Sequence, residues 1–230
     1  MIKTTLALLC VAACAIPAMA SPHNPKLDAR LDAAKHVIQE IESVPDKAIP
    51  QEITENATCV GVVPGLLKAA FVFGGEHGQG VVTCRTGHGW SAPVFIQMTG
   101  GSWGLQIGGQ STDLVLVAVN QRGFQDLLHS KFKIGAGASA AAGPVGRNAQ
   151  MATNWKMQSE LLTWSRSKGL FAGIDLNGTV VAQNKNDTDL FYGDHHSMGA
   201  ILRGDVVPPA EARPFIETVA HYFRESVDSH

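Results

Sequence analysis

The run CVGVVPGLLKAAFVFGGEHGQGVVTCR, residues 59–85, decides the fold class. It contains three short β-rich segments, CVGVV, AAFVFGG and GVVTCR, which are separated at Pro64-Gly65 and by the glycine-rich stretch from Gly74 to Gly80. Short strands divided by turn residues are typical of an antiparallel meander. We therefore expect an α+β protein built on a mainly antiparallel β-sheet or partial barrel with flanking helices.

Further strands are predicted on the C-terminal side of this run. Residues 90–98 predict one strand, and the apolar residues 114–119 (LVLVAV) predict a buried strand that ends at the helix cap Asn120. Residues 132–146 are rich in Gly and Ala and predict another strand. Asn177-Gly178, between LFAGIDL and TVVAQ, predicts a tight hairpin.

Helical patterns flank the predicted strands. Asn24-Pro25 supplies a cap and a first-turn proline for a helix that should end near Pro45. No internal repeat or low-complexity linker divides the chain, so residues 21–230 are interpreted as a single domain. Further helices are predicted at residues 50–57, 120–128, 187–192 and 197–202, and from Pro208 onward.

Residues 1–20 have the features of a secretory leader. Lys3 gives a positively charged start, residues 6–16 are apolar, and Ala18-Met19-Ala20 is an A-x-A site, which predicts cleavage before Ser21. The mature protein would then be exported, either to a periplasm or to the medium. The alternative is a lipoprotein anchored through Cys14, which ends the lipobox-like sequence VAAC.

Charge and cysteine content narrow the possible partners. The formal net charge is −2 and charged residues make up 17% of the chain, which argues against a nucleic-acid-binding protein. Cleavage of the leader leaves Cys59 and Cys84, each within a short β-like run. In an oxidising compartment they could form a cross-strand disulfide, and two separate buried thiols are the alternative.

The sequence TGGSWGLQIGGQSTD, residues 99–113, contains a G-x-S-x-G motif centred on Ser102. A nucleophile elbow requires a sharp turn from a strand into a helix at the serine. Residues 103–112 instead alternate with period two, which predicts a strand that carries Gln106 and Gln110 on one face. We therefore predict that the protein is not an enzyme, and we assign no catalytic residue.

Other chemical motifs are weaker. Residues 135–140 mimic a dinucleotide-binding fingerprint but lack the downstream acidic residue, and residues 143–147 (GPVGR) lack the lysine of a P-loop. His77 and the pair His195-His196 match no compact metal-binding spacing. We predict neither a cofactor nor a metal ion.

The remaining candidates are basic, aromatic and amide side chains. The basic residues fall near the ends of predicted strands or helices, where a fold could gather them, and solvated surface charges are the alternative. Trp103 could line an apolar cavity, although an aromatic residue on a strand can equally belong to the core. The predicted binding site comprises Lys68, Arg122, Lys131, Lys133, Arg147, Trp103, Gln106 and Gln110.

The order of these segments resembles the SYLF domain family. The resemblance runs from about residue 24 to residue 205, and its most specific parts are GLQIGGQSTD (residues 104–113) and AAGPVGR (residues 141–147). It also includes IPQEI, the run that begins CVGVV, NQRGFQDLL and SRSKGLFAGIDLNG.

The resemblance implies a lipid-binding domain without catalytic residues. Eukaryotic SYLF domains resemble phosphoinositide-binding modules, some associated with actin, whereas the bacterial members similar to this chain are stand-alone exported lipid binders. We therefore expect the basic residues to bind an anionic phospholipid or membrane surface, and export makes actin an improbable partner. The alternative is a structural or protein-interaction component of the envelope with no specific lipid ligand.

Overall fold

The computed structural model describes residues 24–43, 48–71, 73–103, 108–135, 139–144, 161–167, 170–173, 176 and 178–224. The predicted leader, residues 1–20, and the alternative lipidation site Cys14 lie outside these ranges.

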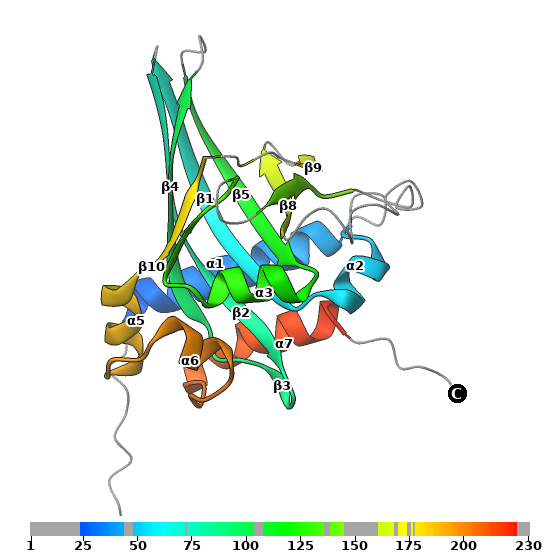
Figure 1. Ribbon diagram of the computed structural model, residues 1–230, viewed down its shortest axis with the longest axis vertical. Helices are drawn as coiled ribbons and strands as arrows, with labels where there is room; N and C mark the ends of the chain where they lie inside the picture. Colours follow the sequence, from blue (N-terminus) through cyan, green and yellow to red (C-terminus); the bar gives the residue numbers. More distant parts are fainter. Residues whose placement is uncertain are drawn as a thin grey trace, which may run out of the picture.

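Ten strands within the described residues form a curled sheet with the order β6-β10-β4-β2-β1-β5-β8-β7, to which β3 is added beside β2 and β9 beside β8. All the described pairings are antiparallel except that of β7 with β8. The predicted α+β fold on a mainly antiparallel sheet or partial barrel is confirmed (Figure 1). The strands are β1 (Cys59–Phe71), β2 (Phe73–Thr86), β3 (Gly89–Trp90), β4 (Val94–Trp103), β5 (Gly108–Ala118), β6 (Lys131–Lys133), β7 (Ala140–Ala142), β8 (Leu161–Ser167), β9 (Leu170–Gly173) and β10 (Val180–Gln183).

The helices begin at the caps that the sequence indicates. The Asn24 side chain accepts a hydrogen bond from the Lys26 amide at the start of α1, and the Asn120 side chain accepts one from the Gly123 amide at the start of α3. Ser197 caps α6 in the same way. The helices are α1 (Pro25–Glu42), α2 (Gln51–Asn56), α3 (Gln121–Leu128), α5 (Lys185–Tyr192), α6 (Met198–Leu202), the 3₁₀ helix η2 (Ala210–Ala212) and α7 (Arg213–Tyr222).

Two clusters of buried side chains lie on opposite faces of the sheet. Because side chains alternate along a strand, Val60 and Val62 of β1 join the cluster that contains the buried residues of α1, α2 and α7. Cys59 and Val63 join the other cluster, which contains buried residues of α3 and α6. The central strands are therefore apolar on both faces, and helices cover both.

The predicted strand boundaries at Pro64-Gly65 and in the glycine-rich stretch are wrong, because β1 and β2 run through them. At Gly65 the register of β1 shifts in a β-bulge, with a φ of 63° and with its amide donating to the Asp113 carboxylate at 2.9 Å. A Cβ on Gly78 would lie 2.6 Å from a Val63 methyl carbon, so glycine lets β2 approach the bulge closely.

The predicted hairpin at Asn177-Gly178 is also wrong. Strand β9 pairs with β8, whereas β10 pairs with β4 and β6. Gly178, with a φ of 91°, donates its amide to the Ile134 carbonyl and so starts the pairing with β6. The strand predicted over residues 132–146 is described only in two short pieces, β6 and β7.

A disulfide joins the beginning of β1 to the end of β2. Cys59 and Cys84 are opposite one another in the antiparallel register, and their sulfur atoms are 1.99 Å apart. Both side chains are fully buried in the cluster beneath α3 and α6.

Candidate functional site

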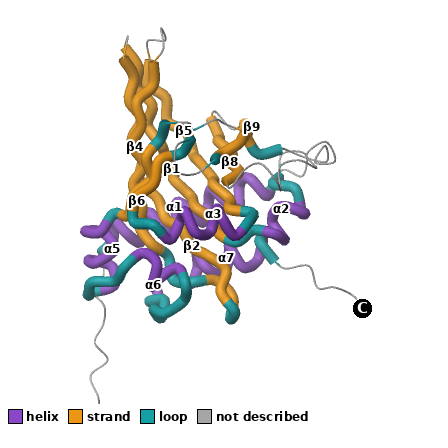
Figure 2. The backbone as a smooth tube through the Cα atoms, in the orientation of Figure 1, coloured by secondary structure: helices purple, strands orange, loops and turns teal. Residues whose placement is uncertain are grey.

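Strands β1, β2, β4 and β5 extend beyond the layer of helices, and the helices gather around the lower half of the sheet (Figure 2). Along one face of β2, Val81 is buried with α1, Gln79 is half-buried and bonded to Arg30 of α1, and His77 is exposed. Strand β4 shows the same change from the buried Phe95 to the exposed Thr99. One sheet face is thus covered at one end and open at the other.

The exposed positions of neighbouring strands lie opposite one another. The register pairs Leu67 with both His77 and Ser111, and it pairs His77 with Thr99. Val180 continues this row from β4 to the edge strand β6. We call this surface the open sheet face, and its exposed residues are Leu67, Gly75, His77, Thr99, Gly101, Gly109, Ser111 and Lys133.

The open sheet face combines one large apolar side chain with bare backbone. Leu67 is 58% exposed, although leucine is among the residues most often buried. A Cβ placed on Gly101 or Gly109 would have no heavy atom within 4 Å. The surface is therefore unobstructed beside Leu67, which suits a broad partner better than a small molecule enclosed in a pocket.

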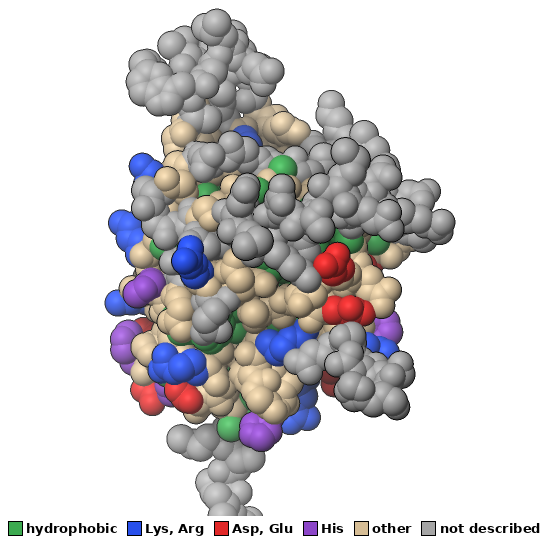
Figure 3. Space-filling view, turned by 45° about the vertical axis from the view of Figure 1, so that its right-hand side comes forward, with side chains coloured by type: hydrophobic (Ala, Val, Ile, Leu, Met, Phe, Trp, Pro, Cys, Tyr) green, Lys and Arg blue, Asp and Glu red, His purple; other side chains and the backbone are tan. Residues whose placement is uncertain are grey.

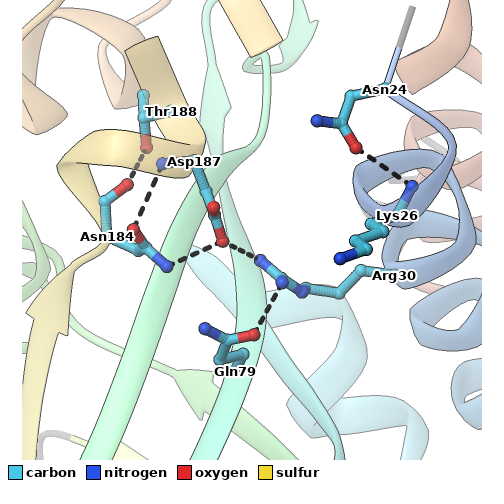
Figure 4. A network of polar contacts seen from close by, with 7 residues as sticks. All are labelled: Asn24, Lys26, Arg30, Gln79, Asn184, Asp187 and Thr188. Atoms are coloured by element: carbon cyan, nitrogen blue, oxygen red, sulfur yellow. Dashed lines mark hydrogen bonds and ion pairs between the residues drawn. The ribbon is translucent and has the colours of Figure 1, made fainter. Parts of the chain in front are cut away.

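A polar network marks the boundary between the covered and the open part (Figure 4). The Arg30 guanidinium of α1 donates to Asp187 of α5 at 2.5 Å and to Gln79 of β2 at 2.7 Å. The Asn184 side chain donates to the same Asp187 carboxylate at 2.7 Å. Arg30 also lies over the Phe95 ring, 5.5 Å from its centroid. This network fixes the first half of α1 against the sheet.

A second set of charges fixes the other half of α1. The Arg166 guanidinium of β8 forms ion pairs with Glu40 of α1 and, at 3.8 Å, with Asp113 of β5. The Asp113 carboxylate also accepts the Gly65 amide at the bulge of β1. The two halves of α1 are therefore bonded to different strands, β2 and β8. These contacts fix where α1 lies on the sheet, and so they fix where the covered part of the face ends.

Of the predicted binding residues, Lys68 and Gln110 lie opposite one another on β1 and β5. Lys68 forms an ion pair with Glu76 at 3.4 Å, and Glu76 in turn accepts a hydrogen bond from Thr179. The Glu76 side chain is only 10% exposed. Lys68 thus neutralises a largely buried carboxylate within the sheet.

Lys131 and Lys133 are both exposed on the edge strand β6. The residue between them, Phe132, is buried in the cluster beneath α3 and α6, so the two lysines point to the other face of the sheet. Arg122 is exposed on α3, the helix that covers the Phe132 side. The structure therefore does not bring the described basic residues into one cradle.

The remaining predicted residues are incompletely described. Trp103 ends β4, where its backbone pairs with Phe73, and its side chain is outside the described part of the structure. Gln106 and Arg147 lie outside the described ranges.

The geometry around Ser102 is that of a strand and not of a nucleophile elbow. Its backbone pairs with Gly74 inside the β2–β4 ladder, so no strand-to-helix turn occurs at this serine. In the described residues, no three His, Cys, Asp or Glu side chains are grouped as metal ligands would be. None of the helices described here combines the length and the apolar character needed to cross a membrane.

Sequence reasoning missed the open sheet face as a surface. Leu67 and Phe95 are both apolar strand residues, and the alternation that reveals a face does not say whether a helix covers it. The signal that was available is the concentration of glycine at matching positions of β2, β4 and β5, since glycine in strands often marks a close approach of backbone or ligand.

Comparison with known proteins identifies relatives that match most of the chain. The family model Ysc84, described as "Las17-binding protein actin regulator", matches residues 99–222. LAS seventeen-binding protein 3 of Saccharomyces cerevisiae is 32% identical over 188 residues, which are 79% of this chain. SH3 domain-containing YSC84-like protein 1 of Mus musculus is 31% identical over 215 residues, which are 90% of this chain.

The relatives are longer than this chain. The match covers 41% of LAS seventeen-binding protein 3, and a match to Protein YSC84 of the same yeast, 33% identical, covers 37% of that protein. For the mouse protein the share is 62%. The chain therefore matches less than two thirds of the length of these relatives.

These names correct the predicted partners. We expected an anionic phospholipid or membrane surface and considered actin unlikely because of export. The family model is described by Las17 binding and actin regulation, and the relatives are named for Las17 binding or for an SH3 domain. These descriptions point to protein partners and overturn that prediction. Actin was considered unlikely because residues 1–20 resemble a secretory leader, and this leader lies outside the described residues.

Proposed function

The chain belongs to the Ysc84 (SYLF) family, and we propose that it is a non-catalytic domain that binds actin through the open sheet face. The observation that carries this proposal is the match of the family of actin regulators to more than half of the chain, residues 99–222, which include Thr99, Gly101, Gly109, Ser111 and Lys133 of that face. Export through residues 1–20 remains a separate prediction, and the proposed binding concerns the purified protein.

The form of the open sheet face supports a protein ligand. Specific protein interfaces bury on the order of 800 Å² on each partner and have an apolar centre with a polar rim. Leu67 provides an apolar centre, 58% exposed, with His77, Thr99 and Ser111 at the neighbouring strand positions. The glycines beside it leave backbone accessible, so a partner can approach the sheet closely.

The strand geometry at Ser102 is compatible with a binding role. Ser102 is a strand residue, and no metal-ligand cluster occurs in the described ranges. A general acid or base would need a positioned titratable group beside a reacting atom. His77, the titratable member of the open sheet face next to Leu67, is exposed on a strand.

Co-sedimentation of the purified full chain with actin filaments tests the proposal. We expect the chain to pellet with filaments, and we expect Leu67→Asp to reduce pelleting by about tenfold, because a charge in the apolar centre of an interface must be desolvated. The matched control is Val207→Asp, because Val207 is an exposed apolar residue, 86% accessible, in the loop after α6.

Each outcome of this experiment is decisive. If the chain does not pellet with filaments, the proposed function is wrong. If it pellets and Leu67→Asp pellets equally well, actin binding stands but the open sheet face is not the surface. Unfolding of Leu67→Asp is checked by circular dichroism, and Leu67→Gln then replaces it as the milder variant.

A further inference from the structure

A pocket with a volume of 430 Å³ lies where the end of α3, the beginning of α5 and α6 meet. It is separate from the open sheet face, and none of the residues predicted from the sequence as a binding site lines it. The size is within the range of ligand pockets in proteins, about 300–1,000 Å³. It can hold one or two side chains of a partner but not a whole helix.

The floor of the pocket is buried and preformed. Met198 is 2% exposed and Gln183 is 7% exposed, and both line the pocket. The Gln183 side chain donates to the His196 carbonyl at 3.4 Å, which ties the loop before α6 to β10. Gly199 also lines the floor, and a Cβ there would lie 2.9 Å from an Arg203 guanidinium nitrogen.

The rim of the pocket is basic. Its lining includes His129, Lys185, His195, His196 and Arg203 and contains no Asp or Glu among the described residues. Besides Asp194, whose carboxylate accepts the His195 amide at 2.7 Å, two carboxylates pair with rim side chains: Asp189 contacts the His195 ring at 2.7 Å, and Asp205 lies 3.6 Å from Arg203. The side chains of that second pair are both more than half exposed, so this ion pair contributes little and leaves Arg203 able to exchange partners.

Buried groups fix the position of the His196 ring. Tyr192 packs edge-on against His196, with ring centroids 5.8 Å apart, and its hydroxyl donates to the Pro93 carbonyl at 2.5 Å. Burial raises the pKa of Tyr192 above its ordinary value, so the hydroxyl keeps its proton and this hydrogen bond. One wall of the pocket is therefore anchored to the core and not to solvent.

Beyond the pocket, the edge strand β6 carries two exposed lysines, which point to the sheet face opposite α3 and α6. The Gln183 amide donates to the Ser130 carbonyl, and Lys131 and Lys133 follow directly as exposed residues. Lysine, arginine and histidine side chains gather along the left edge of the view in Figure 3, with acidic side chains at its lower end. This concentration contrasts with a chain whose formal net charge is −2.

We propose that this pocket binds a short acidic segment of a partner protein, with carboxylates at the basic rim and one apolar side chain on the Met198 floor. Carboxylates form charge-assisted hydrogen bonds with guanidinium and ammonium groups, and the buried floor favours an apolar side chain between them. The proposal goes beyond the proposed function and rests on it only in taking the ligand to be a protein.

Fluorescence anisotropy of the full chain with labelled peptides tests the proposal. The probe is a peptide of Asp and Glu with a central Leu, and it is compared with the same peptide carrying Gly for Leu and with one carrying Lys for each acid. We expect binding of the first peptide alone, weakened about tenfold by Lys185→Gln combined with Arg203→Gln. The matched control is Arg213→Gln combined with Arg224→Gln, which removes the same charge from exposed positions on and after α7.

The outcomes separate this inference from the actin proposal. No binding of the acidic peptide, or equal loss in both double variants, overturns the pocket assignment, whether or not filaments are bound. Inorganic phosphate that displaces the peptide fully at equal concentration would show a small-anion site and also overturn it. Peptide binding that is lost only in the Lys185 and Arg203 variant supports the pocket even if the chain fails to pellet with actin.

Discussion

The covered and open halves of one sheet face are built by the same strands but differ in the burial and packing of their side chains. On the covered half, Phe95 of β4 is fully buried, packs edge-to-face against Phe191 at 5.1 Å and lies beneath the Arg30 guanidinium. On the open half, Leu67 of β1 is 58% exposed beside glycine positions that have space above them. The β2–β4 pairing runs unbroken through both halves, and the β1–β2 pairing spans both with a β-bulge between them.

The contrast shows that the helices, and not the strands, determine which part of this face is core. Helix α1 is tied by Arg30 at one end and by the ion pair of Glu40 with Arg166 at the other, so the cover stops at a fixed line. In the covered half, apolar side chains stabilise the fold because they are buried away from water. In the open half, exposed side chains contribute little to the stability of the fold and are available to bind a partner.

Truncation of one apolar residue in each half gives the largest expected contrast. Phe95→Ala should lower the free energy of unfolding by about 3–5 kcal/mol, because it removes a fully buried ring and leaves a cavity. Leu67→Ala should change it by less than about 0.5 kcal/mol. Urea unfolding followed by circular dichroism measures both. Equal losses for the two variants would contradict the division into covered and open halves.

The disulfide provides the next effect in size, and it belongs to the covered end of the strands. Reduction, or the double substitution Cys59→Ala and Cys84→Ala, should lower the free energy of unfolding by about 3 kcal/mol, because the bond restricts the unfolded chain. The bond closes a separation of 25 residues. Urea unfolding with and without reductant measures the loss, and the double variant is the control because it must not respond to reductant. An unchanged midpoint on reduction of the natural chain would show that the strand pairing alone holds β1 against β2.

The sequence predicted elements whose signals are local. The predicted caps Asn24 and Asn120 begin helices as expected, and the apolar run at residues 114–119 lies largely in the buried strand β5. The hairpin at Asn177-Gly178 failed because that turn leads β10 to β6 and β4. Which strand pairs with which depends on distant partners that no turn dipeptide specifies.

The candidate site was less accessible to prediction. Lys68 could be recognised as basic, but its partner Glu76 was identified only by the β1–β2 register. The basic rim of the pocket combines Lys185 of α5 with residues just after α3 and on either side of α6, such as His129 and Arg203, which are far apart in the chain. A period-two pattern likewise reveals the face of Leu67 but not the position at which α1 ends its cover.

The smallest expected effect is a pH dependence of stability that arises from Glu42, the last residue of α1, at the edge of the covered half. Burial raises the pKa of this carboxyl from 4.5 to about 7, partly offset by a hydrogen bond from the Ile49 backbone. Its Oε1 atom is buried and has no hydrogen-bond partner among the described residues. The folded protein therefore holds a proton on Glu42 at pH values where the unfolded chain has lost it.

The sign of the pH dependence follows from this difference in proton binding. Between about pH 4.5 and pH 7 the folded state binds more protons than the unfolded state, so stability falls as pH rises and levels off above pH 7. Since the side chain is only partly buried, we expect a loss of roughly 2 kcal/mol across this range. Glu42→Gln should remove that loss and be more stable than the natural chain at pH 8, as urea unfolding at pH 5 and pH 8 would measure. Glu217→Gln, at an exposed position of α7, should keep the natural pH dependence. Parallel pH profiles for Glu42→Gln and the natural chain would mean that α1 ends in solvent and that the covered half stops short of Glu42.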